Sequence, residues 1–165
     1  MRTDTPHVVL KTLTSSALAC CLLAGARAQP DQGSALPFWR LGPVENSGLH
    51  QPMQRVISDQ NEFIRLWALV WANYPRPPEP PAIDFSKEAV VVLALGQRNT
   101  GGYAIRAAGV TYAQGSLEVV VLTSSPGLGC VVTTSFTSPV ELLRVGVPAK
   151  SAKFHAQVSA VNCTQ

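Results

Sequence analysis

Hydrophobic and polar residues follow a helical period in one part of the chain and a strand period in the rest. Between residues 59 and 74, apolar side chains recur every three or four positions, which is typical of one buried helix face. The residues on this face are Phe63, Leu66, Trp67, Val70 and Tyr74. Asp59, with Glu62 three residues later, predicts where the helix begins, and Pro75 predicts that it ends at the preceding residue. We favour core packing over ligand binding for this aromatic face.

Strand patterns precede and follow the helix. Segment 53–58 predicts a short strand, and the unbroken apolar run 89–96 predicts a strand that is buried on both faces. Segments 103–110 and 116–123 predict two more strands, joined by a turn at 111–115. Because strand follows strand through short connections, we expect antiparallel pairing. The predicted fold class is α+β, a mainly antiparallel β-sheet or sandwich with one N-terminal amphipathic helix.

The C-terminal part of the chain allows two interpretations. Segment 131–147 can form two strands separated at Pro139, or one long strand with a bulge there, because proline donates no hydrogen bond to a ladder. Segment 153–161 alternates strictly and predicts a half-buried strand. Its inward side chains are expected to be Phe154, Ala156, Val158 and Ala160. If it forms a hairpin with one long strand, Cys130 and Cys163 approach closely enough for a disulfide, and we therefore expect the long bulged strand.

The N-terminus has the features of an export signal. Residues 1–28 combine basic residues, an apolar stretch too short to span a bilayer and the small-residue cleavage site Ala26-Arg27-Ala28. We expect cleavage after Ala28 and a secreted or periplasmic protein. Lipoprotein processing at Cys20 or Cys21 is the alternative that would attach the protein to a membrane, although the residues before both cysteines fit a lipobox poorly.

The predicted organisation has three parts: a signal peptide at 1–28, an extended Gly- and Pro-rich segment at 29–48 and one domain at 49–165. The full chain carries 13 basic and 10 acidic residues. Removing residues 1–28 takes away three basic residues and one acidic residue, which leaves 10 minus 9, a net charge of +1. No cluster of Lys and Arg remains, so we expect no nucleic-acid partner.

Two of the four cysteines lie in the expected signal peptide, which leaves Cys130 and Cys163. Outside the cytoplasm a pair of thiols normally oxidises, so we expect one disulfide. A free catalytic cysteine or a metal pair would need partner residues that the sequence does not supply.

Two glycine-rich segments, 97–103 and 124–129, leave the predicted antiparallel strands at the same end of the sheet; we call them the rim. A phosphate-binding loop would lead into a helix, whereas a strand follows here. A tight turn alone would explain why Asn99 and two glycines occur in the first segment, because these residues would supply the positive φ angles that such a turn needs. Protein recognition is the alternative. The candidate binding residues are Arg98, Asn99, Thr100, Gly101, Gly102, Tyr103, Pro126, Gly127 and Leu128.

Catalytic patterns are absent from the sequence. It contains no Gly-x-Ser-x-Gly, His-Glu-x-x-His or Cys-x-x-Cys motif. His50 and His155 are far apart, and carboxylates such as Asp84, Glu88 and Glu118 are scattered. We therefore expect no enzymatic activity, no metal site and no cofactor.

The sequence resembles the PrcB C-terminal domain family over residues 55–148. The resemblance rests on the strings VISDQNEFIRLW, DFSKEAVVVLALGQRNTGGY, PGLGC and TSPVELLRVGVP. The Thr-Gly-Gly-Tyr segment after the apolar strand is the most specific of these. The resemblance implies an exported, non-catalytic module whose partner is another exported protein, with a secreted protease complex as the candidate.

A weaker resemblance concerns the chagasin family of exported inhibitors of papain-like cysteine proteases. It rests on NTGGY beside a second glycine-rich loop, and it implies direct protease inhibition as the alternative function. The family's Asn-Pro-Thr-Thr and Arg-Pro-Trp segments are missing here. The expected strand order also sends the third loop, 149–152, to the far end of the sheet.

Overall fold

The computed structural model describes residues 33–163, so the expected signal peptide lies outside the described part of the chain. The strands are β1 (Ser34–Ala35), β2 (Phe38–Val44), β3 (Met53–Ile57), β4 (Ala89–Ala94), β5 (Ala104–Ala113), β6 (Ser116–Pro126), β7 (Val140–Val145) and β8 (Ala152–Val161), and the helix is α1 (Gln60–Val70). Strands β3, β4 and β8 lie within two residues of the ranges that the sequence predicts, and β5 and β6 each end three residues later than predicted.

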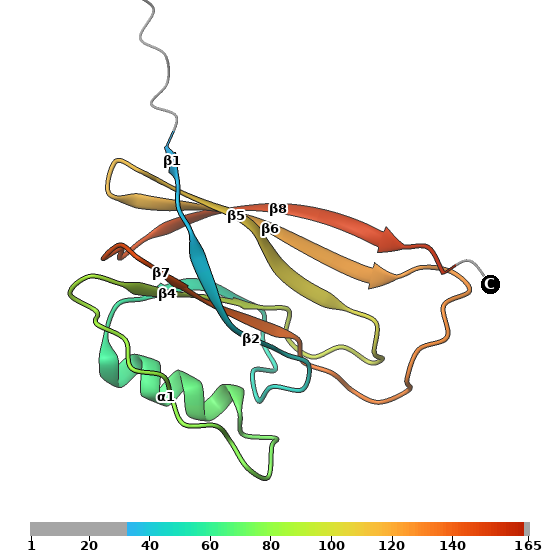
Figure 1. Ribbon diagram of the computed structural model, residues 1–165. Coiled ribbons are helices and arrows are strands. Elements are labelled where there is room, and N and C mark those ends of the chain that lie inside the picture. Colours follow the sequence, from blue (N-terminus) through green and yellow to red (C-terminus); the bar gives the residue numbers. More distant parts are fainter. Residues whose placement is uncertain (1–32, 164–165) are drawn as a thin grey trace, which may run out of the picture. The chain divides into compact units, whose positions relative to one another are not determined.

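Two four-stranded sheets and the helix form three layers (Figure 1). The outer sheet has the order β1-β5-β6-β8, and the central sheet has the order β2-β7-β4-β3. Helix α1 packs on the face of the central sheet that is turned away from the outer sheet. The α+β sandwich with one helix is therefore confirmed.

Strand β4 is the centre of this arrangement. All six of its residues are buried, because the outer sheet covers one face of the strand and α1 covers the other. Val91 and Leu93 pack between the two sheets, whereas Val90 and Val92 pack against the helix layer. The prediction that this apolar run forms a strand buried on both faces is therefore confirmed.

Helix α1 begins as predicted and ends earlier than predicted. The side chain of Asp59 caps it by accepting a hydrogen bond from the backbone N–H of Glu62 at 2.8 Å. Its last residue is Val70, and Tyr74 is half-buried in the turn that follows. The carbonyl of Leu69 accepts hydrogen bonds from Ala72 and from Gly48 outside the helix, and these bonds close the last turn before Pro75 is reached.

The expected long bulged strand is wrong. Only β7 is extended in segment 131–147, and it pairs with β2 and β4 in the central sheet. Five of its six residues are buried, a pattern that fits a central strand with apolar layers on both sides and not an outer strand. Residues 127–139 carry the chain from one sheet to the other without regular structure.

The expected hairpin between β7 and β8 is also wrong, because the two strands belong to different sheets. Strand β8 returns to the outer sheet and pairs in parallel with β6, from Leu117 opposite Ala152 to Pro126 opposite Val161. Parallel neighbours need a long crossover connection. Here the crossover is segment 127–151, which contains a whole strand of the other sheet.

The inward face of β8 is only partly covered. Phe154 is half-buried between the sheets, but Ala156, Val158 and Ala160 are exposed, and Val158 is 80% exposed. Strands β6 and β8 extend beyond the end of β7 (Figure 1), and Val158 lines a shallow hollow with Leu95 and Arg98 instead of packing into the core. The predicted half-burial is therefore wrong for the second half of the strand.

Residues 33–48 belong to both sheets. Strand β1 pairs with β5, and β2 pairs with β7 as the edge of the central sheet. Phe38 packs against the core between the sheets, whereas Trp39 is exposed beneath the guanidinium of Arg144, whose Cζ lies 5.0 Å from the ring centroid.

Candidate functional site

The two rim segments lie at the same end of the outer sheet, as the sequence predicts. Ala104 at the start of β5 is paired with Ser124 near the end of β6. A Cβ atom built on Gly102 would lie 3.1 Å from the Cβ of Pro126, so the two segments are in direct contact. The rim is one continuous surface.

The glycines of the rim have different roles. Gly102 has a φ of +84°, which favours glycine. Gly101 does not have a positive φ, but a Cβ there would lie 2.5 Å from the hydroxyl of Thr133. Asn99 also lacks a positive φ, so the expectation that Asn99 and both glycines supply this geometry is wrong except at Gly102.

A third segment, 127–139, forms part of the site; it overlaps the second rim segment at 127–129, and sequence reasoning did not assign residues 130–139 to the site. Arg98 and Thr137 exchange two backbone hydrogen bonds, of 2.7 and 3.0 Å. Gly101 donates to the carbonyl of Thr133 at 3.0 Å, and the hydroxyl of Thr137 donates to the carbonyl of Thr100 at 2.9 Å. The first rim loop is therefore held against this segment. The polar string TTSFTS, which lacks the alternation of a strand, was the available signal.

The expected rim side chains differ in how far they reach into solvent. The guanidinium of Arg98 turns back to donate to the carbonyl of Leu95 at 3.0 Å and lies over the Tyr103 ring. Arg98, Thr100 and Tyr103 are half-buried, whereas Leu128 is fully exposed. Arg98 thus supports the loop instead of projecting from it.

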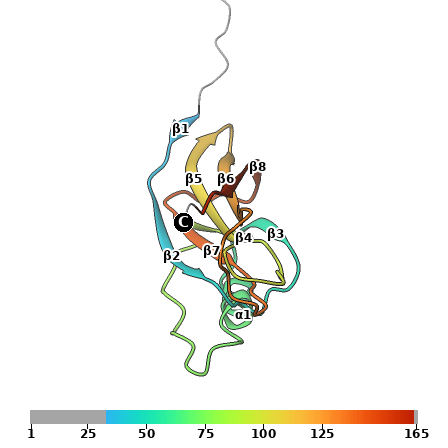
Figure 2. The same cartoon turned by 90° about the vertical axis from the view of Figure 1, so that its right-hand side faces the viewer.

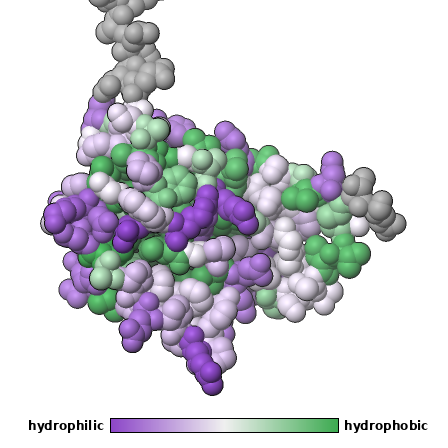
Figure 3. All heavy atoms as spheres, viewed as in Figure 1, coloured by the Kyte–Doolittle hydropathy of each residue, from purple (hydrophilic) through white to green (hydrophobic). Residues whose placement is uncertain are grey.

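Large apolar side chains project from segment 127–139. Leu128 and Val131 are almost completely exposed, and Phe136 is 63% exposed. Figure 3 shows separate apolar groups among paler residues at this end of the molecule. Exposed apolar side chains that gather in one place mark interaction surfaces more often than single scattered ones do.

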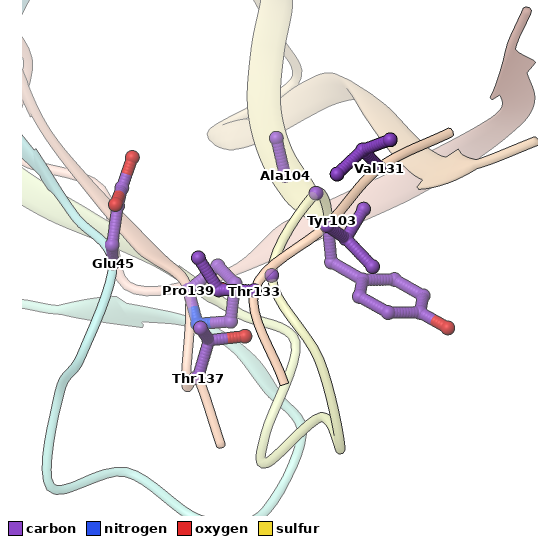
Figure 4. A pocket seen from close by; sticks show the side chains of 10 residues that line it. Glu45, Tyr103, Ala104, Val131, Thr133, Thr137 and Pro139 are labelled. Carbon is purple, nitrogen blue, oxygen red and sulfur yellow. The ribbon is translucent and has the colours of Figure 1, made fainter. Parts of the chain in front are cut away.

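A hollow of about 450 Å³ lies between the first rim loop and segment 127–139 (Figure 4). Thr133, Thr137 and Pro139 line it, with Glu45 on one side and Val131 on the other. Glu45 is the only charged side chain in its lining, and no histidine or cysteine is present there. The hollow offers hydroxyl, backbone and apolar contacts, which suit binding, and no nucleophile with a neighbouring base.

The disulfide is confirmed: Cys130 and Cys163 are bonded, with their Cα atoms 5.0 Å apart. The bond does not depend on the long bulged strand that the sequence predicts. Since β8 runs parallel to β6, its end arrives beside the end of β6, where Cys130 follows. The backbone N–H of Gly127 donates to the carbonyl of Val161 at 2.9 Å, which joins the same two segments.

Gly127 is expected to be intolerant of a side chain. A Cβ there would lie 2.6 Å from the carbonyl oxygen of Val161, a backbone atom that also accepts the hydrogen bond from Gly127. Gly127→Ala should therefore lower the free energy of unfolding by on the order of 1 to 2 kcal/mol, measured by chemical denaturation. Gly109→Ala is the matched control, because a Cβ at Gly109 meets no atom within 4 Å and its φ is not positive. Equal stability of the two variants would contradict the assigned contact.

Metal sites and membrane-spanning helices are two further features that the described residues could contain. Residues 33–163 contain no group of three or more His, Cys, Asp or Glu side chains placed to hold a metal ion. Within the same residues, no helix is both long enough and apolar enough to cross a membrane.

The fold and the site define a small β-sandwich module whose distinctive surface is built from loops. Residues 89–146 match the PrcB C-terminal family model, which confirms the resemblance to this family over that part of the expected range 55–148. The matched segment runs from the start of β4 to just beyond β7 and includes both rim segments and segment 127–139. The family is of an accessory type and is not a known catalytic family. No curated protein and no solved structure matches the chain significantly.

The loop at 149–152 lies at the opposite end of the outer sheet from the rim. Ala152 is paired with Leu117, next to the turn between β5 and β6. An inhibitor that uses three neighbouring loops at one end of the sandwich would need this loop beside the rim.

Proposed function

We propose that this protein is an exported, non-catalytic module that binds another exported protein through the rim and segment 127–139. We further propose that the partner is a protease or a protease assembly. The observation that carries the proposal is that two features occur in the same segment. The residues that match the PrcB C-terminal family also include the exposed apolar side chains of Leu128, Val131 and Phe136.

Rigidity of the loops supports this use. The Cys130–Cys163 bond and the backbone hydrogen bonds at Arg98, Gly101 and Gly127 hold these segments in place. A surface that is already ordered loses less conformational entropy when a partner binds, so more of the contact energy appears as affinity. Export is supported by the N-terminal signal pattern and by a disulfide, which persists in oxidising compartments.

Truncating the exposed loop residues is expected to weaken partner binding and to leave the fold intact. We expect the double variant Leu128→Ser/Val131→Ser to bind its partner about tenfold more weakly or worse, because it removes apolar surface that the partner would cover. The melting temperature should change little, since both side chains are exposed in the free protein. Arg98 is not used for this test because its guanidinium supports the loop.

The experiment is capture from the exported fraction with the purified domain, followed by affinity measurement on the identified partner. The control is Leu69→Ser, which changes an exposed apolar side chain on α1. If the double variant binds as tightly as the wild type, or if the control weakens binding equally, the loop surface is not the binding site. A captured partner that is neither a protease nor part of a protease assembly would reject the more specific proposal only.

A further inference from the structure

The outer edge of β8 carries unpaired backbone groups. At the two ends of the β6–β8 ladder, Leu117 donates to the carbonyl of Ser151 at 3.1 Å and Gly127 donates to the carbonyl of Val161 at 2.9 Å. Successive residues of a strand point their N–H and C=O groups to opposite sides, and the register of this pair has no shift. The odd-numbered residues of β8 therefore bond to β6, and the even-numbered residues between 152 and 160 point their N–H and C=O groups away from the sheet. Figure 2 shows β8 as the outermost strand of its sheet.

The other three sheet edges have protective features that β8 lacks. Strand β1 is only two residues long, and β2 has a register shift between Arg40 and Gly42, followed by Pro43. Strand β3 has five residues and carries Arg55, which is paired with a helix carboxylate. Natural sheets use short length, bulges, proline and charge to prevent edge pairing. Strand β8 has ten residues, and its second half, 156–161, contains no charge, no proline and no bulge.

The side chains of β8 define what can lie next to it. The face that continues the core carries Ala156, Val158 and Ala160, which are all exposed, and Val158 borders a shallow hollow beside Leu95 and Arg98. The opposite face carries polar residues such as Gln157 and Ser159. A neighbouring strand must therefore be apolar on the first face and polar on the second, and β8 itself has this pattern.

We propose that two copies of this chain associate through β8, which pairs antiparallel with β8 of the second copy about a two-fold axis. The two outer sheets then form one continuous eight-stranded sheet. Only even-numbered residues present free donors and acceptors, so even-numbered residues of the two copies pair with one another. In every such register Ala156 and Val158 of both copies lie on one face, where they form a continuous apolar stripe.

The charges of β8 favour the antiparallel arrangement. Lys153 and His155 lie in the first half of the strand, and the second half is uncharged. Antiparallel pairing places these basic side chains opposite residues near Ser159 and Val161, whereas parallel pairing would place like charges side by side. The inference does not depend on the proposed partner or on the rim.

Sedimentation equilibrium of the purified exported chain tests the proposal across a range of concentrations. We expect a monomer–dimer equilibrium for the wild type, which Val158→Lys weakens about tenfold or more because it places charge on the apolar stripe. Ala156→Pro should do the same, since it removes an outward N–H without breaking a bond to β6. The control Leu69→Lys, on the exposed side of α1, should leave the equilibrium unchanged.

A cross-linking measurement keeps the test independent of whether these variants fold well. The residue on the two-fold axis faces its own copy, with Cβ atoms about 4.5 to 5.5 Å apart. One of Ala156→Cys, Gln157→Cys and Val158→Cys should therefore cross-link two chains on mild oxidation, and Leu69→Cys should not. A wild-type protein that stays monomeric at all concentrations overturns the proposal, and so does a dimer that both β8 variants leave intact. Neither result bears on partner capture, which is measured separately.

Discussion

Replacing Arg40 by Met is expected to lower the free energy of unfolding by about 2 kcal/mol, less than for a fully buried pair because the Arg40 side chain is 43% exposed. Its partner Glu141, the second residue of β7, is only 1% exposed. One carboxylate oxygen is paired with the Arg40 guanidinium, and the other accepts the backbone N–H of Ala107 at 2.6 Å. Without Arg40, the carboxylate would remain buried with a single donor. Removing one partner of a buried pair is costly because it leaves such an uncompensated charge.

Chemical denaturation of the single and double variants tests this role. Arg144→Met is the control, because the carboxylate that it would leave unpaired, Glu88, is partly open to solvent whereas Glu141 is buried, and a smaller loss is therefore expected. The double variant Arg40→Met/Glu141→Leu should be more stable than Arg40→Met alone, since it removes the buried charge together with its partner. If Arg40→Met costs no more than Arg144→Met, Glu141 does not depend on the ion pair.

Glu141 also explains how the two sheets are joined. It belongs to β7 in the central sheet, and Ala107 belongs to β5 in the outer sheet. The register of β5 shifts between Ala107 and Gly109, and that of β2 shifts between Arg40 and Gly42. The carboxylate therefore bridges the two layers at a pair of irregular positions. In the sequence, a single glutamate within VELLRV has no feature that distinguishes it from a solvent-facing residue.

The elements that the sequence predicts well are those determined by local pattern. The run 89–96 could be assigned to a strand with two covered faces, because a continuous apolar segment has no place at the surface. Asp59 and the spacing from Phe63 to Val70 identified the helix start and its buried face. The paired loops at 97–103 and 124–129 followed from the alternation of antiparallel neighbours.

The arrangement of the C-terminal strands could not be predicted, because no local pattern says which sheet a strand joins. Periodicity identifies 153–161 as a strand, but it does not distinguish an antiparallel neighbour of β7 from a parallel neighbour of β6. The exposure of Val158 depends on where the strands of the central sheet end, and other parts of the sequence determine those ends. For the same reason residues 130–139 could not be assigned to the site: the contacts of this stretch with Arg98 and Gly101 come from its path between the sheets.

The disulfide gives the second large expected effect. We expect Cys130→Ser/Cys163→Ser to lower the free energy of unfolding by roughly 3 to 4 kcal/mol and the melting temperature by about 10 °C. The bond closes a loop with a sequence separation of 33, and opening it enlarges the conformational freedom of the unfolded chain. Reduction of the wild-type protein should give the same loss. Thiol counting on the unfolded, unreduced protein should find no free thiol at Cys130 or Cys163.

The same variant is expected to loosen one region before the rest of the molecule unfolds. The second half of β8 is exposed on both faces and is held by its ladder with β6, by the bond from Gly127 to Val161 and by the disulfide. Few buried apolar contacts stabilise it, so it belongs to the part of the fold that opens most easily. Hydrogen exchange in the double variant should therefore increase most at the odd-numbered amides between 157 and 161, and least in β4. If hydrogen exchange instead became faster by the same factor in β4 and β8, the disulfide would stabilise the molecule only as a whole and not the end of β8 in particular.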